Sequence, residues 1–264
     1  MSAAIVSEIR KLRSTRLWWI LLLIMAVTVA TFAGSLAFAM TFGMEGADGP
    51  APDQQSVAIT IYTMGVSLGY VFPLVLGALA VTSEFRHRTI DATLLLDPNR
   101  LRVIASKFIA ILPFALLYGL VSMASGVAVG VGAFAIAGEP LLLDEPAVWE
   151  AIGLGVVAIA AWALVGVGFG TALTNQVVVI VAVLGWTQFV EPILRIALGF
   201  VESLSGVAAY LPGAAGEALV GTSFYSATGA SELLAPWAGL LVLLGYAVIA
   251  AVIGWLTTFR KDIT

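Results

Sequence analysis

The sequence has little charge and no cysteine. Of its 264 residues, only 11% are Asp, Glu, Lys or Arg, whereas an ordinary soluble domain carries about 25%. A soluble fold needs polar side chains to cover its surface, so this shortage excludes a soluble globular protein and a disordered one. The absence of cysteine excludes a disulfide framework, a thiolate nucleophile and a cysteine metal site.

Histidine and lysine are also scarce, which excludes two further kinds of site. A zinc site of the HExxH type needs two histidines, and the chain has only His87. A P-loop needs glycine directly before its lysine, but the three lysines follow Arg10, Ser106 and Arg260. We therefore expect no enzyme activity, no bound metal and no cofactor in this chain.

Long apolar stretches are abundant. Hydrophobic residues make up 61% of the chain, and the mean hydropathy is +1.05. A helix needs about 20 apolar residues to cross a bilayer, and uncharged stretches of this length recur. We predict an all-α polytopic membrane protein with one transmembrane domain over 1–264. Its six spans are expected at about 17–42, 57–83, 108–138, 151–174, 177–190 and 235–259, the fourth and fifth being divided at Thr174–Asn175–Gln176.

The charges are unevenly distributed around these six spans. If the spans cross in turn, one side of the membrane has 11 of the 12 basic residues and 5 of the 16 acidic ones, a net charge of +6. The other side has one basic and 11 acidic residues, a net charge of −10. Loops rich in Lys and Arg remain in the cytoplasm. We therefore predict a protein of the bacterial cytoplasmic membrane with both termini cytoplasmic.

The first 16 residues are expected to form a helix of their own. Ile5, Ile9 and Leu12 recur at i, i+4 and i+7, and charged residues occupy the other faces. This pattern is typical of an amphipathic helix lying in the membrane interface. Basic residues that merely flank the first span, without a defined helix, are the alternative.

Residues 191–211 form a second segment outside the regular pattern. The segment is apolar but contains Arg195 and Glu202, and counting it as a seventh span would place Arg260 outside. We therefore predict a re-entrant or surface helical element on the outer face, between the fifth and sixth spans.

Polar side chains recur at helical spacing within the spans. Such stripes can line a substrate path, although Ser and Thr also bond to neighbouring helices. Glu191 and Arg195, four residues apart at a membrane edge, can form an ion pair and are candidates for an outer gate. The candidate path residues are Thr31, Ser35, Thr63, Ser67, Tyr70 and Gln188.

Residues 65–69 match the G-x-S-x-G pattern of serine hydrolases. That motif requires a strand–turn–helix context and a nearby histidine. Here it lies within a span, and His87 is 20 residues beyond Ser67, about 30 Å along a helix. We interpret the glycine pair as a surface of small residues where two helices approach closely.

The loop after the second span combines charge with apolar side chains. It contains Phe85 and Ile90 among the charged residues Glu84, Arg86 and Arg88. This mixture is typical of a short helix that another protein binds, and a solvated charged loop is the alternative.

Four segments together resemble the type-2 ABC transporter permeases of actinobacteria. Residues 8–16 resemble their amino-terminal signature, and residues 81–86, followed by Thr89–Ile90 and Thr93–Leu94, resemble their first cytoplasmic loop. Residues 210–216 resemble the segment before their last span, and residues 236–240 resemble the start of their sixth helix. The resemblance extends over nearly the whole chain.

This resemblance implies a mechanism and a set of partners. In such families a permease dimer pairs with two separate ATPase subunits, which bind ATP and Mg, and most members are exporters that work by alternating access. The implied partners are an ATPase dimer, a second copy of this chain or a related permease, and the lipid bilayer, without nucleic acid. The implied ATPase-coupling residues are Glu8, Lys11, Arg13, Glu84, Phe85, Arg86, His87 and Arg88. A passive channel or a non-transporting membrane scaffold is the alternative, and the residues do not identify the substrate.

Overall fold

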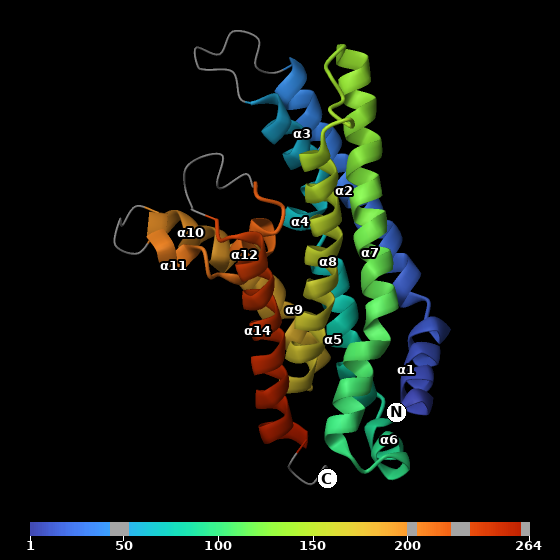
Figure 1. Ribbon diagram of the computed structural model, residues 1–264. Coiled ribbons are helices and arrows are strands. Elements are labelled where there is room, and N and C mark those ends of the chain that lie inside the picture. The colour runs from blue at the N-terminus through green and yellow to red at the C-terminus, as the bar shows by residue number, and fades with distance from the viewer. Residues whose placement is uncertain (43–52, 200–204, 223–232, 260–264) are drawn as a thin grey trace.

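The computed structural model describes residues 1–42, 53–199, 205–222 and 233–259, and every regular element within them is helical. The helices are arranged mostly along one axis (Figure 1). Five helical runs in the described residues are long and apolar enough to cross a membrane. They are α2 (Leu17–Phe42), α7 (Arg100–Ala137), α8 (Pro146–Ala172), α9 (Gln176–Gly185) with its continuation, and α14 (Pro236–Gly254) with its continuation.

Two of these runs continue through a π-helical turn. α9 passes through η1 (Trp186–Val190) into α10 (Glu191–Gly199), and α14 passes into η3 (Trp255–Phe259). The fifth span is therefore longer than the predicted 177–190. Residues 191–199, which were predicted to begin a separate re-entrant or surface element, continue this helical run instead. The start of the fifth span agrees with the predicted division at Thr174–Asn175–Gln176. α8 ends at Ala172, and the Asn175 side chain accepts hydrogen bonds from the first amides of α9.

The predicted second span, 57–83, is not one helix. The structure has three segments instead, which lie one below another in Figure 1: α3 (Gln54–Tyr62), α4 (Met64–Leu68) and α5 (Val71–Arg86). Pro73 explains the second break, because proline has no N–H to donate to the carbonyl of Gly69 four residues earlier. It is tolerated in the first turn of α5 for the same reason. The prediction of a continuous helix here was wrong.

α8 is the central helix of the described bundle. It packs against α5, α7 and α14, and most of its side chains beyond residue 157 are buried. Small residues make these contacts close. A Cβ at Gly166 would strike the carbonyl oxygen of Leu74 in α5, and one at Gly168 would strike that of Ala247 in α14. Close backbone approach of this kind is how membrane helices gain packing energy.

Gly65 and Gly69, the two glycines of the G-x-S-x-G match, also allow helices to pack closely. A Cβ at Gly65 would strike the Ser122 hydroxyl of α7, and one at Gly69 would lie 3.0 Å from a methyl group of Val29 in α2. The interpretation of this motif as a helix-packing surface is therefore confirmed.

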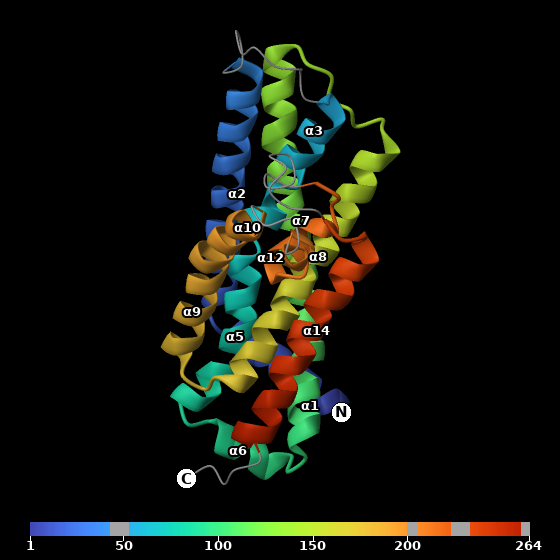
Figure 2. The same cartoon turned by 90° about the vertical axis from the view of Figure 1, so that its left-hand side faces the viewer.

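The two ends of the bundle differ in the elements they contain. One end has α1 (Ser2–Ser14), the end of α5, α6 (Ile90–Leu96), the start of α7 and η3 (Figures 1 and 2). At the other end, α3 and the adjoining parts of α2, α7 and α8 extend beyond the level of α4. α10 and α12 (Pro212–Ala218) lie at about the level of α4. α11 (Ser205–Ala208) lies beside α10. α1 confirms the predicted helix at the start of the chain.

Candidate functional site

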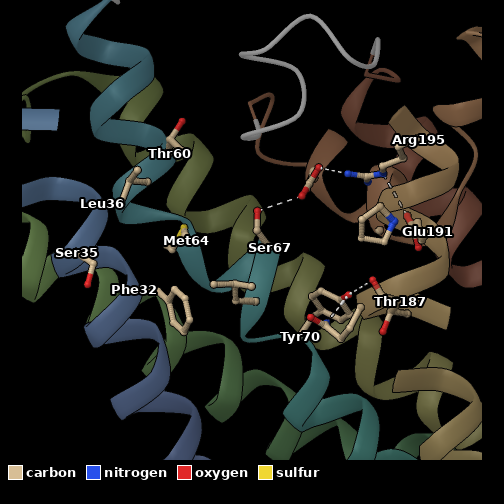
Figure 3. Close-up of a pocket in the computed structure, with 15 residues that line it drawn as sticks. Phe32, Ser35, Leu36, Thr60, Met64, Ser67, Tyr70, Thr187, Glu191 and Arg195 are labelled. Carbon is tan, nitrogen blue, oxygen red and sulfur yellow. Dashed lines mark hydrogen bonds and ion pairs between the residues drawn. The ribbon is translucent and has the colours of Figure 1, made fainter. Parts of the chain in front are cut away.

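A cavity of about 490 Å³ lies at the level of α4, with one side formed by α2 and the opposite side by η1, α10 and α12 (Figure 3). Its volume falls within the range of about 300–1,000 Å³ that is typical of small-molecule sites. Most of the surface of its lining is apolar, and the charged side chains gather on the side of α10 and α12. The lining residues are Phe32, Ser35, Leu36, Thr60, Met64, Ser67, Leu68, Tyr70, Thr187, Gln188, Glu191, Pro192, Arg195, Gly213 and Glu217.

The structure brings most of the candidate path and gate residues to this cavity. Ser35, Ser67, Tyr70, Gln188, Glu191 and Arg195 all line it. Thr31 and Thr63 do not: the Thr31 hydroxyl donates to the Val27 carbonyl on an exposed face of α2, and the buried Thr63 hydroxyl donates to Ile59. These two hydroxyls bond within their own helices, which is the common use of threonine in apolar helices.

Arg195 is the centre of a buried ion cluster beside the cavity. Its Nη1 lies 2.7 Å from Glu217 Oε2, and its Nε lies 3.3 Å from Glu191 Oε1. The Ser67 hydroxyl donates to Glu217 Oε1 at 3.1 Å, which connects α4 to α12. The three charged side chains are 2–5% exposed, so they interact in a medium that screens charge far less than water.

Sequence reasoning missed Glu217. The available signal was an acidic residue within the otherwise uncharged stretch 203–231, where a charge is costly unless it has a partner. Its partner is Arg195, which lies 22 positions earlier and was assigned only to Glu191. The predicted Glu191–Arg195 pair exists, but the shorter contact of Arg195 is with Glu217.

The backbone of α12 holds Glu191 in place. The amide of Ala214 donates to Glu191 Oε1 at 3.1 Å, and a Cβ at Gly213 would lie only 2.5 Å from the same oxygen. Glycine at this position therefore lets the carboxylate approach the chain. The other oxygen, Oε2, is buried and has no hydrogen-bond partner among the described residues.

Tyr70 forms an aromatic and polar floor next to the acidic side chains. Its ring stacks on Trp162 of α8, with the ring centroids 4.3 Å apart. Its hydroxyl accepts a hydrogen bond from Gln188 Nε2 at 3.0 Å and lies 3.4 Å from the Thr187 carbonyl. Thr187 and Gln188 belong to the π turn η1, and such turns recur at functional sites because they reorient side chains locally.

A second buried ion cluster lies at the end of the bundle that contains α1, α6 and the start of α7. It contains Glu8 and Lys11 of α1, Glu84 of α5 and Lys107 of α7. Lys11 Nζ lies 2.6 Å from both carboxylates, and Lys107 Nζ lies 2.7 Å from Glu8 and 2.8 Å from Glu84. Two positive and two negative charges therefore balance. Lys11–Glu84 ties α1 to α5, Lys107–Glu8 ties α1 to α7, and Lys107–Glu84 joins α5 to α7.

The opposite charges within this cluster shift the pKa values of Lys11 and Glu84. Burial alone lowers the pKa of Lys11, but the two carboxylates outweigh burial and the pKa is raised. Burial alone raises the pKa of Glu84, but Lys107 and Lys11 outweigh it and the pKa is lowered. The charged forms are thus stabilised by their partners, which is the condition for an ion cluster to persist away from water.

The candidate coupling residues divide into two groups. Glu8 and Glu84 are buried and Lys11 is half-buried in the cluster, and Phe85 packs edge-on against Phe259 with centroids 5.6 Å apart. The exposed members of the set are Arg13, Arg86, His87 and Arg88. Of these four, Arg86 also donates from its guanidinium to Gln176 Oε1 at 3.1 Å.

Two further residues at this end were missed from sequence. Lys107 was counted only as a basic loop residue, yet it is buried within α7. Leu95 of α6 is 85% exposed, whereas Ile90 at the start of the same helix is buried. A single apolar side chain gives no sequence signal for exposure, because its surroundings depend on how α6 packs.

The described residues contain no group of three His, Asp or Glu side chains that could hold a metal ion. The geometry instead defines an all-α, multi-pass membrane protein with a largely apolar cavity and two buried ion clusters, one beside the cavity and one where α1 meets α5 and α7. The family described as ABC-2 family transporter protein matches residues 4–204, which is more than half of the chain. The chain therefore belongs to this family and is a membrane permease subunit of an ABC transporter. No curated protein matches the sequence.

Proposed function

We propose that this chain is the permease of an ATP-driven exporter, which moves its substrate outward by alternating access while a separate ATPase subunit hydrolyses ATP with Mg. The proposal combines the family membership with the lysine contexts, since no lysine follows a glycine and a P-loop is therefore absent. The observation that carries it is the cavity of about 490 Å³, which brings the polar path residues together among apolar helices.

The proposed orientation has both termini in the cytoplasm of a bacterial cell. α1 and η3 lie at one end of the bundle, together with the end of α5 and the start of α7 (Figure 1). Every described basic residue except Arg195 belongs to elements at this end. The positive-inside rule supports placing that end in the cytoplasm.

The proposed coupling surface is formed by α1, the end of α5 and α6. The exposed Arg86, His87 and Arg88 precede α6, and Leu95 provides an apolar contact on it. Movement of this surface would be transmitted inward through Glu84 and Lys107, because these buried charges link α5 and α7 to α1. Glu8, Lys11 and Glu84 thus act by positioning helices rather than by touching the ATPase.

The proposed outer gate is the contact of Ser67 and Arg195 with Glu217. It holds α4 against α10 and α12 beside the cavity. An outward-open state would separate these elements and break the contact. A second permease copy would complete the path, since α2 and α9 present apolar side chains such as Val27, Phe38 and Val181 at their surfaces.

Reconstitution tests this proposal. The chain is co-expressed with the genes that neighbour its own and purified in mild detergent, and ATP-dependent substrate movement is then measured in proteoliposomes. We expect a Walker-A ATPase to co-purify and movement to require ATP. Recovery of the permease alone, or movement without ATP, would favour the channel or scaffold alternative. The control replaces the Walker-A lysine of the ATPase, which leaves assembly intact and removes hydrolysis.

A further inference from the structure

We propose that the cavity binds an amphipathic organic molecule carrying one positive charge. The inference rests on the proposed function, because it names the class of substrate that the transport path accepts. Three features of the cavity carry it: the balance of its charges, a carboxylate oxygen without a hydrogen-bond partner, and the chemistry of the remaining lining.

The charges of the described lining residues do not cancel. Glu191 and Glu217 are both buried, and Arg195 pairs with both. One guanidinium against two carboxylates leaves one net negative charge. A net charge in an apolar cavity is costly, and a ligand with one positive charge compensates it, whereas a neutral ligand does not and an anion increases the cost.

Glu191 offers the place for this charge. Its side chain is 2% exposed, and Oε1 already accepts from the Ala214 amide and contacts Arg195. Oε2 has no hydrogen-bond partner among the described residues. This oxygen is buried, so a ligand reaches it when the carboxylate turns towards the cavity that Glu191 lines. An ammonium group would then supply the missing hydrogen bond, and a charged donor makes a stronger bond than a neutral one.

The rest of the lining suits an organic body rather than a metal ion. Phe32, Leu36 and Met64 face the cavity opposite the acidic side chains (Figure 3). Among the described residues, no group of three His, Asp or Glu side chains could hold a metal ion. Tyr70, stacked on Trp162, adds an aromatic surface that attracts a cation near its face. The volume of about 490 Å³ accommodates a molecule of drug size.

Binding to matched probes tests the charge preference without the ATPase. The purified chain in detergent is equilibrated by dialysis with 1-pyrenemethylamine, 1-pyrenemethanol or 1-pyrenecarboxylate, and binding to empty micelles is subtracted. The three probes share one ring system and differ in charge. We expect the ammonium probe to bind at least about tenfold more tightly than the alcohol, and the carboxylate to bind most weakly. Equal affinity for the ammonium and the carboxylate would overturn the proposal.

Variants locate the preference. Glu191→Gln should lower the affinity for the ammonium probe about tenfold and leave the alcohol unchanged, because the amide keeps the shape and removes the charge. The matched control is Glu150→Gln, an exposed residue on α8 outside the cavity, which should preserve the preference. A preference that survives Glu191→Gln, or that Glu150→Gln also removes, contradicts the proposal.

A third variant covers the case in which Glu191→Gln fails to fold. Met64→Trp narrows the cavity from α4 without changing any charge, and it should weaken binding of both the ammonium and the alcohol. Unchanged ammonium binding in this variant would place the probe elsewhere and refute the proposal. These results are separate from the transport assay: ATP-driven movement with no charge preference refutes the cation inference alone, and cation binding without an ATPase partner refutes the exporter alone.

Discussion

The Nζ atom of Lys107 on α7 lies 2.7 Å from Glu8 Oε2 on α1, with 1% of the lysine side chain exposed. The same Nζ lies 2.8 Å from Glu84 and donates to the Ala80 carbonyl at 3.1 Å. One buried ammonium therefore connects the first helix of the chain to two helices of the bundle. α1 is therefore fixed to α7, and through the same ammonium to α5.

Removing this ammonium should destabilise the protein strongly. Lys107→Met leaves two buried carboxylates with one lysine, and breaking a buried ion pair in this way costs about 3–5 kcal/mol. The control is Arg102→Ala, which removes a half-exposed pair with Asp97 and should cost less than about 1 kcal/mol. Unfolding in detergent measures both, and equal losses would show that the cluster contributes no more than a surface pair.

The cluster also makes stability depend on pH. The pKa of Glu84 is lowered from 4.5, so its stabilising contribution is present above that pH and is lost as pH falls through the folded-state value. The pKa of Lys11 is raised from 10.5, so its contribution is present below that pH and is lost as pH rises through the folded-state value. We expect α1 to detach in acid below pH 4.5, measured as proteolysis of residues 2–14. A wild type that shows no acid-induced cleavage there would contradict this prediction.

Leu95 should be needed for ATPase association. Leu95→Asp places a charge on the most exposed apolar side chain of α6, and we expect co-purification with the ATPase to fall about tenfold or more. Ile136→Asp is the matched control, because Ile136 is 82% exposed at the opposite end of the bundle. Equal ATPase recovery with both variants would remove α6 from the proposed coupling surface.

Arg88 allows folding and coupling to be separated. Its backbone has φ 55°, a conformation that favours glycine, so Arg88→Gly should preserve or raise stability by up to about 1 kcal/mol. We expect it nevertheless to lower the rate of ATP hydrolysis by the assembled transporter, since a basic contact with the ATPase is lost. Leu142→Gly, at φ 53° in the opposite half of the molecule, should give a similar stability and normal turnover. Normal turnover with Arg88→Gly would show that this side chain does not touch the ATPase.

Close packing around α8 can be tested with one methyl group. Gly166→Ala would force a Cβ into the backbone of α5, and we expect a loss of about 1–3 kcal/mol. Gly153→Ala on the same helix meets no atom within 4 Å and should be neutral or slightly stabilising. Similar stabilities for the two variants would show that α5 and α8 can separate without cost.

Much of the fold is predictable because its signals are local. Apolar stretches define the first and last spans to within one residue, whereas α7 begins eight residues and α8 five residues before the predicted starts. Asn175 marks the start of the fifth span by capping α9, and the i, i+4, i+7 pattern gives α1. The broken second span was not predicted. Its composition resembles that of the other spans, and the effect of Pro73 depends on whether a helix precedes it.

The candidate site was predictable only in part. Helical spacing selected the stripes containing Ser67, Tyr70 and Gln188, but it could not separate them from Thr63, whose hydroxyl bonds within its own helix. Spacing also found the Glu191–Arg195 pair, since both residues are on one helix. Glu217 could not be found in this way, because its partners Ser67 and Arg195 are 150 and 22 residues away in the chain.

The sequence by itself determined the class of protein, since hydropathy and the scarcity of charge are properties of the chain that no packing can alter. Tertiary structure decided the roles of the few charges. Glu84 and Arg86, two residues apart at the end of α5, have opposite environments: the first is buried between two lysines and the second is exposed. Burial of this kind depends on which distant helices pack together, and the free energy of a charge depends on the partners they bring.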